Sequence, residues 1–191
     1  MYATGKVVEA KKLNDKKRFN TRNIALISIF GALWIALNLV AAPISFSLTG
    51  LPVIHVFLVY FVLLLVVWAT GEFGAASFVG LVGSAIVLLA GGPLPMFGFA
   101  AGSVLFDSIL ILNHHILTTK NSSIAIAVIA TIVSSYVAGN INGLLILNLP
   151  LAFSATIWSG ENLAGATLSL IVALPTINFL EKAKIRQIIS N

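Results

Sequence analysis

Six long apolar segments constrain this chain more than any other feature of its sequence. They cover residues 23–42, 51–70, 75–90, 96–112, 124–149 and 157–180, and none of them contains Lys or Arg. About twenty apolar residues in an α-helix span the ~30 Å hydrocarbon core of a bilayer. The chain is 59% hydrophobic and 9% charged, whereas a soluble domain is about 25% charged. The sequence therefore predicts an all-α membrane protein built as a bundle of six transmembrane helices.

Prolines and glycines mark the expected ends of these helices. Pro43 is expected to end the first helix, because its ring cannot continue one, and residues 45–50 to form a polar turn. Residues 91–95, Gly-Gly-Pro-Leu-Pro, break the third helix from the fourth, and Pro150 is expected to end the fifth. The chain then divides into a basic tail (1–22), a membrane domain (23–180) and a second basic tail (181–191).

The positions of Lys and Arg predict the orientation of the bundle. Seven lie in residues 1–22, Lys120 lies between the fourth and fifth helices, and Lys182, Lys184 and Arg186 follow the last helix; these are all 11 in the chain. If all six apolar segments span the membrane, the N-terminal tail, the connection that holds Lys120 and the C-terminal tail lie on the same side. The positive-inside pattern then places both termini in the cytoplasm of a multi-pass plasma-membrane protein. A nucleic-acid-binding arm is the less favoured interpretation of residues 1–22, which also lack the apolar core of a signal peptide.

Polar residues gather toward the opposite, outer ends of the predicted helices. They are contributed by four helices and comprise Asn38, His55, Asn142, Trp158, Glu161 and Asn162. A polar or ionisable side chain in an apolar bundle needs a partner, a water-filled cavity or a ligand. We expect these six residues to bind a substrate in a cavity open to the exterior, with Tyr136 and Phe97 among its aromatic walls.

Simpler interpretations exist for the same residues. Trp158 could be an interfacial anchor, His55 a packing histidine, and Glu161 an acid that reaches the membrane surface. Asn38 and Asn142 could form hydrogen bonds between helices.

Two further polar features lie toward the inner side. Asp107 is expected to have a structural or coupling role, including bonds to the ends of neighbouring helices. The adjacent His114 and His115 make a poor metal pair, because neighbouring residues on a helix point about 100° apart, and a solvated loop is expected there.

Several kinds of chemistry have no motif in this sequence. There is no phosphate-binding G-x-x-x-x-G-K-[ST] loop, no His-Glu-x-x-His and no Gly-x-Ser-x-Gly, and Cys is absent. The chain is therefore not expected to be an enzyme or to hold a cofactor or metal. A six-helix bundle with an outer cavity and no energy source of its own indicates a binding subunit that is driven by other proteins.

Ala32 and Ala36 lie four residues apart in the first apolar segment, a spacing that lets helices pack closely. A family resemblance rests on these two residues, on the size of the chain, on its predicted cytoplasmic termini and on the connection over residues 43–52. The chain resembles the substrate-binding S components of energy-coupling factor transporters. Their Ala-xxx-Ala motif lies on helix 1, and their connection between helices 1 and 2 forms a lid.

The resemblance implies a vitamin or related micronutrient bound from outside. It also implies one transmembrane coupling protein and two ATPase subunits as partners, with Ala32 and Ala36 docking on the coupling protein. A nickel or cobalt cargo is disfavoured, because the chain begins Met-Tyr-Ala and lacks the N-terminal Met-His arm of the metal branch.

Charge narrows the expected cargo. The outer half holds no Lys or Arg to clamp a carboxylate or phosphate, while Glu161 favours a cation or a hydrogen-bond donor. A thiamine-like or pyrimidine compound is the first expectation and cobalamin the second. Two other functions remain open: a stand-alone proton-coupled carrier and a non-transporting membrane assembly subunit.

Overall fold

The computed structural model describes residues 20–50 and 53–185, which form helices and, within those ranges, no strand. The long helices are α2 (Thr21–Thr49), α3 (Val53–Thr70), α4 (Ala75–Leu89), α5 (Met96–Leu110), α6 (Asn121–Asn140) and α8 (Ser159–Lys182). The shorter pieces are the 3-10 turn η1 (Ile111–Asn113), α7 (Leu151–Phe153) and the π-helical segments η2 (Ile141–Ile146) and η3 (Ser154–Trp158). The all-helical fold is confirmed. Most of both predicted basic tails, and residues 51 and 52 of the predicted lid, lie outside the described residues.

Within residues 20–50 and 53–185, five segments are long and apolar enough to cross a membrane, consistent with a multi-pass membrane protein. They are Thr21–Ser45, Val53–Thr70, Met96–Asn113, Asn121–Ile146 and Leu151–Lys182. The remaining apolar helix, α4, has 15 residues. At ~1.5 Å per residue it covers roughly 22 Å, less than the ~30 Å hydrocarbon core. Five helices therefore qualify as spans, and α4 is shorter than a full one.

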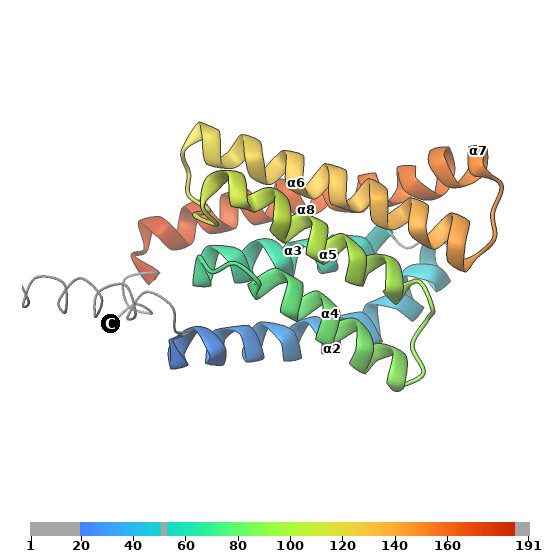
Figure 1. Ribbon diagram of the computed structural model, residues 1–191, viewed down its shortest axis with the longest axis horizontal. Helices are drawn as coiled ribbons and strands as arrows, with labels where there is room; N and C mark the ends of the chain where they lie inside the picture. The colour runs from blue at the N-terminus through green and yellow to red at the C-terminus, as the bar shows by residue number, and fades with distance from the viewer. Residues whose placement is uncertain (1–19, 51–52, 186–191) are drawn as a thin grey trace, which may run out of the picture.

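The six long helices run along the long axis of the molecule (Figure 1). Neighbouring helices pack in the closed order α2, α4, α5, α6, α8, α3 and back to α2. The start of α2 and the end of α8 lie at one end, which we call the terminal end, and α7 lies at the other, which we call the α7 end (Figure 1). Both α3 and α8 begin at the α7 end, so these two neighbours run parallel.

Close packing holds the bundle together, as is expected where lipid removes the water-driven attraction between helices. Most of the α3 side chains are buried, and they form much of the apolar core. Glycines allow close approach. A Cβ on Gly83 of α4 would lie 2.5 Å from the Trp34 ring of α2, and one on Gly165 of α8 would lie 2.6 Å from the Val53 carbonyl oxygen of α3.

The first helix does not end at Pro43, so that expectation is wrong. Helix α2 continues through Pro43 to Thr49, and Gly50 follows with a left-handed φ of 68°. A proline removes a single N–H bond from a helix, and in membrane helices nearby groups compensate for it. A glycine that adopts φ > 0 without strain is the stronger end signal here.

The fifth and sixth helices also differ from expectation near Pro150. Helix α6 ends at Asn140 and continues as η2, rather than running as one α-helix to residue 149. Pro150 begins the next helix instead of ending the previous one: its φ of −54° and ψ of 142° place it just before α7. Proline suits the first turn of a helix, because the N–H it lacks would be unpaired there in any case.

Asp107 and His115 meet at the terminal end of the bundle. Asp107 is fully buried, and its Oδ2 accepts a hydrogen bond of 3.1 Å from the N–H of Ser77 in the first turn of α4. The expected bond from Asp107 to the end of a neighbouring helix is therefore present. His115 is buried, with Nε2 2.9 Å from the Asp107 carbonyl oxygen and 3.4 Å from its Oδ1. The expectation of a solvated loop is wrong for His115, while His114 is exposed.

Candidate functional site

A small cavity lies at the α7 end of the bundle. Seven residues line it: His55, Pro93, Pro95, Phe99, Asn142, Trp158 and Asn162. Its volume is about 10 Å³, close to the least space that holds one water molecule. Four of the eight residues predicted to bind substrate meet here, and they are polar side chains from three parts of the fold.

The local structure explains why these four side chains converge. His55 lies in the first turn of α3, and Asn142 is the second residue of η2. Trp158 and Asn162 are four residues apart, so they project from the same face of the last helix, one turn from each other. The two π segments thus supply Asn142 and Trp158, while α3 and α8 supply the other two.

Hydrogen bonds fix how the two asparagines present their amides. Asn162 donates Nδ2–H to the Trp158 carbonyl oxygen at 2.9 Å. Asn142 uses the other end of its amide: its Oδ1 accepts from the Gly98 N–H at 3.0 Å. What remains for a ligand is therefore the acceptor Oδ1 of Asn162 and the donor Nδ2 of Asn142.

Three of the lining side chains bury polar atoms that make no hydrogen bond to the residues the structure describes. They are His55 Nε2, Trp158 Nε1 and Asn162 Oδ1. His55 and Asn162 are 2% and 1% exposed. A buried polar group without a partner costs about 1–3 kcal/mol, so three such atoms beside one cavity mark a place where a ligand or water would be stabilised.

The remaining walls are apolar and were not predicted. The Phe99 ring lies 5.1 Å from the His55 ring, measured between centroids, and Pro93 and Pro95 come from the α4–α5 connection. The sequence signal for these prolines is the Gly-Gly-Pro-Leu-Pro break itself, because a loop at the same end as the polar residues can close over them. No charged side chain is among the seven lining residues.

Three other predicted site residues lie outside this cavity. Asn38 is buried in α2, where its Nδ2 donates to the Trp34 carbonyl at 2.6 Å. Tyr136 and Phe97 are 40% and 53% exposed and face outward. They lie at the expected depth but are rotated away, so the structure does not bring them to the site.

Glu161 is buried, at 8% exposed, but it does not line the cavity. Gly165, one turn further along α8, lies against the Val53 carbonyl of α3. Because α8 begins at the α7 end, Glu161 lies one turn closer to that end than this contact (Figure 1). Its Oε2 makes no hydrogen bond within the described part of the chain.

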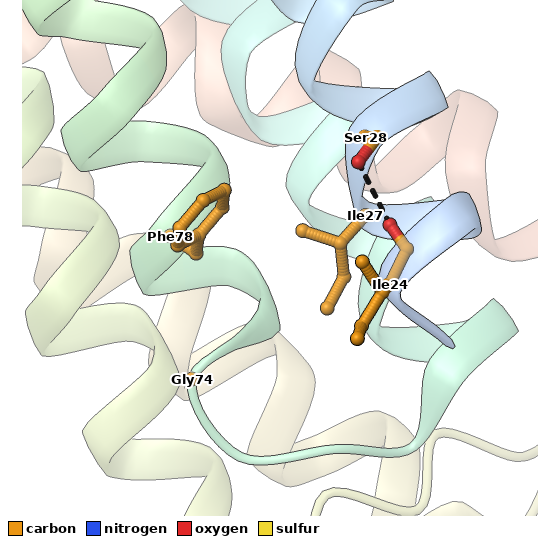
Figure 2. Close-up of a pocket in the computed structure, with 5 residues that line it drawn as sticks. All are labelled: Ile24, Ile27, Ser28, Gly74 and Phe78. Carbon is orange, nitrogen blue, oxygen red and sulfur yellow. Dashed lines mark hydrogen bonds between the residues drawn. The ribbon is translucent and has the colours of Figure 1, made fainter. Parts of the chain in front are cut away.

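Ala32 and Ala36 are exposed on α2. Nearby, between α2 and α4, lies an apolar groove of about 240 Å³ lined by Ile24, Ile27, Ser28, Gly74 and Phe78 (Figure 2). Its one hydroxyl, on Ser28, already donates to the Ile24 carbonyl at 2.9 Å (Figure 2). The groove is larger than the polar cavity, but it offers no group that would select a polar ligand.

Metal binding has no support in residues 20–50 and 53–185, where no three His, Cys, Asp or Glu side chains lie together. Comparison with known proteins found no matching family model, no matching curated protein and no matching solved structure.

Proposed function

We propose that this chain is a membrane-embedded substrate-binding subunit of the energy-coupling factor type, which captures a vitamin or related micronutrient for ATP-driven uptake by partner proteins. The observation that carries the proposal is the polar cavity at the α7 end. Three of the residues that line it, His55, Trp158 and Asn162, each bury one polar atom that has no partner in the described bundle. In an apolar helix bundle, polar groups of this kind mark binding sites.

The orientation proposed for the bundle puts this cavity on the outside. The α5–α6 connection with Lys120 and the end of α8 lie at the terminal end, opposite the cavity. The positive-inside pattern favours a cytoplasmic location for that end. A site at the opposite end then takes its ligand from the exterior.

Two observations support the proposed partners: the sequence has no ATP-binding motif, and α2 has an exposed face of small residues. The sequence has no phosphate-binding loop, so ATP hydrolysis needs other subunits. Ala32 and Ala36 are small, exposed and one turn apart on α2, which suits close packing of another membrane helix. We propose that the coupling protein docks on this face and links the chain to two ATPases.

A vitamin needs more room than this cavity offers. Small-molecule sites usually have volumes of about 300–1,000 Å³. Ligand entry therefore requires movement at the α7 end. The segments there suit such movement: η2 and η3 are π-helical, and Asn148 between them has a left-handed φ of 51°.

Co-purification tests the proposed partnership. The tagged chain, expressed in its own cells, should bring down a membrane protein and two ATPases. Ala32→Trp and Ala36→Trp should abolish this while the purified chain keeps its ligand affinity. Ala125→Trp is the matched control, because Ala125 is exposed on α6, away from α2. If all three variants co-purify equally, α2 is not the docking face.

Reconstitution tests the competing functions. The chain in proteoliposomes without ATPases should show no uptake driven by a pH gradient. Uptake under those conditions would support a stand-alone proton-coupled carrier. Absence of any ligand binding, together with stable association with membrane proteins other than ATPase partners, would support an assembly subunit.

A further inference from the structure

We infer that the cavity recognises the lactam edge of a neutral, planar ligand, with Trp158 donating to a carbonyl oxygen and Asn162 accepting from the neighbouring N–H. This inference rests on the proposed function and specifies its ligand chemistry. A lactam edge is an N–H next to a C=O in a ring, as in a pyrimidinone. The recognition atoms are Trp158 Nε1 and Asn162 Oδ1, both buried and without hydrogen-bond partners in the described bundle.

The donor and acceptor roles follow from geometry. Trp Nε1–H can only donate. The amide of Asn162 cannot be reversed without losing its bond, because the group facing the Trp158 carbonyl at 2.9 Å must be the N–H₂ end. Its oxygen is therefore the free end, and it can only accept. The protein thus offers one fixed donor and one fixed acceptor.

These two residues are close enough for one small ring to contact both. Trp158 and Asn162 are one turn apart on the same face, so their Cβ atoms are about 5–6 Å from each other. Asn142 can add a second donor, since its Oδ1 is already occupied by Gly98 N–H. His55 Nε2 can donate or accept, depending on its tautomer. A ligand with only acceptors would leave Asn162 unpaired, and one with only donors would leave Trp158 unpaired.

The lining also specifies charge and shape. No lining residue is Lys, Arg, Asp or Glu, so a carboxylate or a cation would be buried without a counter-charge. Glu161, the acid expected to favour a cation, lies outside the lining. The rings of His55, Phe99 and Trp158 provide flat apolar surfaces that suit a planar ligand. The structure thus favours a neutral pyrimidine over the thiamine cation.

Three pyrimidine probes separate these features in calorimetric binding to the purified chain. Uracil has the lactam edge and no charge at neutral pH. In 1,3-dimethyluracil the carbonyls remain and both N–H donors are lost, while orotate adds a carboxylate. Uracil should bind, and the other two should bind at least about tenfold more weakly, the effect of roughly one lost hydrogen bond in a buried site. No binding of uracil, or equal binding of uracil and dimethyluracil, would overturn the inference.

Two variants assign the contacts to atoms. Asn162→Leu should weaken uracil binding about tenfold and leave dimethyluracil unchanged, because the dimethyl probe has no N–H to lose. Trp158→Phe should weaken both probes, since both keep their carbonyls. A loss of equal size for both probes in Asn162→Leu would contradict the assigned pairing. This comparison stays valid if a variant lowers stability, because both probes are measured on the same folded protein.

Each variant has a matched control elsewhere in the fold. Trp68→Phe also removes an unpartnered indole N–H, but Trp68 is outside the cavity. Asn140→Ala removes the same kind of bond, Nδ2–H to the carbonyl four residues earlier, at 3.0 Å, and Asn140 is not among the lining residues. Neither control should change the affinity for uracil by more than about twofold. A larger effect would indicate a general loss of structure and overturn the assignment.

The outcomes also distinguish this inference from the proposed function. If ATPases co-purify, uracil does not bind and a ligand without a lactam edge does bind, the inference fails and the proposed function stands. If the uracil pattern is as expected but uptake follows a pH gradient without ATPases, the inference stands and the function fails.

Discussion

Gly98 holds the cavity wall in place, and replacing it with alanine is the most direct test of the described packing. Gly98 lies in the first turn of α5, against α6 and η2. A Cβ at this position would lie 2.6 Å from the Ala138 carbonyl oxygen and would overlap the side-chain amide of Asn142. The Gly98 N–H donates to Asn142 Oδ1 at 3.0 Å. The added methyl group must therefore displace α5 from α6 and break this bond.

The expected cost can be assembled from three contributions. Overpacking of a tight contact costs about 1–3 kcal/mol, because backbone atoms of Ala138 cannot move aside as a side-chain end can. Loss of the bond between Gly98 and Asn142 costs about 1 kcal/mol. Alanine in a helix is favoured over glycine by up to ~1 kcal/mol. The net loss in free energy of unfolding is about 2 kcal/mol.

The assay is equilibrium unfolding in mixed micelles titrated with SDS, followed by helical circular dichroism. Gly31→Ala and Gly160→Ala are matched controls, since a Cβ at either helical position would meet nothing within 4 Å. Both should be neutral or up to ~1 kcal/mol more stable. Uracil affinity should fall in Gly98→Ala and not in the controls, because Asn142 moves. If Gly98→Ala is as stable as Gly31→Ala, α5 and α6 are not as close as the structure places them.

Substitutions at three further positions test other parts of the structure. Glu161→Gln should change uracil affinity less than about threefold, because Glu161 lies outside the cavity lining. A tenfold loss of affinity, measured by calorimetry, would place Glu161 in the site. Asp107→Ala should lower the free energy of unfolding by about 1–3 kcal/mol, since the N–H of Ser77 loses its acceptor, and Asp107→Asn should recover part of the loss. Pro43→Ala should raise stability by up to ~3 kcal/mol by restoring a helical N–H bond, and a loss of stability would mean that α2 depends on the proline.

Helix positions along the sequence could be predicted because apolar length and charge placement determine them. The membrane segments begin and end within a few residues of expectation wherever a charge or glycine marks the boundary, as at Thr70 and Gly74 around the α3–α4 connection. The predicted helix ends are wrong at Pro43 and Pro150, where proline was expected to end a helix. In a membrane helix the cost of one missing bond is small beside the cost of exposing several backbone groups to lipid, so the helix continues through Pro43.

The depth of the site residues could be predicted, but their rotation about the helix axes could not. His55, Asn142, Trp158 and Asn162 share a depth and meet at the cavity. Tyr136 has a similar depth and points outward. Successive residues turn by about 100°, so direction depends on which face each helix packs, and nearly uniform apolar helices carry no periodic signal of that face. The π segments add a further shift, because i→i+5 bonds change the rotation of every residue after them.

Glu161 shows how an unusual residue can indicate a site without belonging to its lining. As the one acid among the polar residues predicted at the outer ends of the helices, it suggested a cationic ligand. It is buried and its Oε2 has no hydrogen-bond partner in the described bundle, but it does not line the cavity. Trp158 and Asn162, on the same helix, do line the cavity, and their unpaired Nε1 and Oδ1 are the atoms that a ligand or water there would pair. The chemistry that the site selects is therefore set by those uncharged atoms, and it favours a neutral hydrogen-bonding ring over a cation.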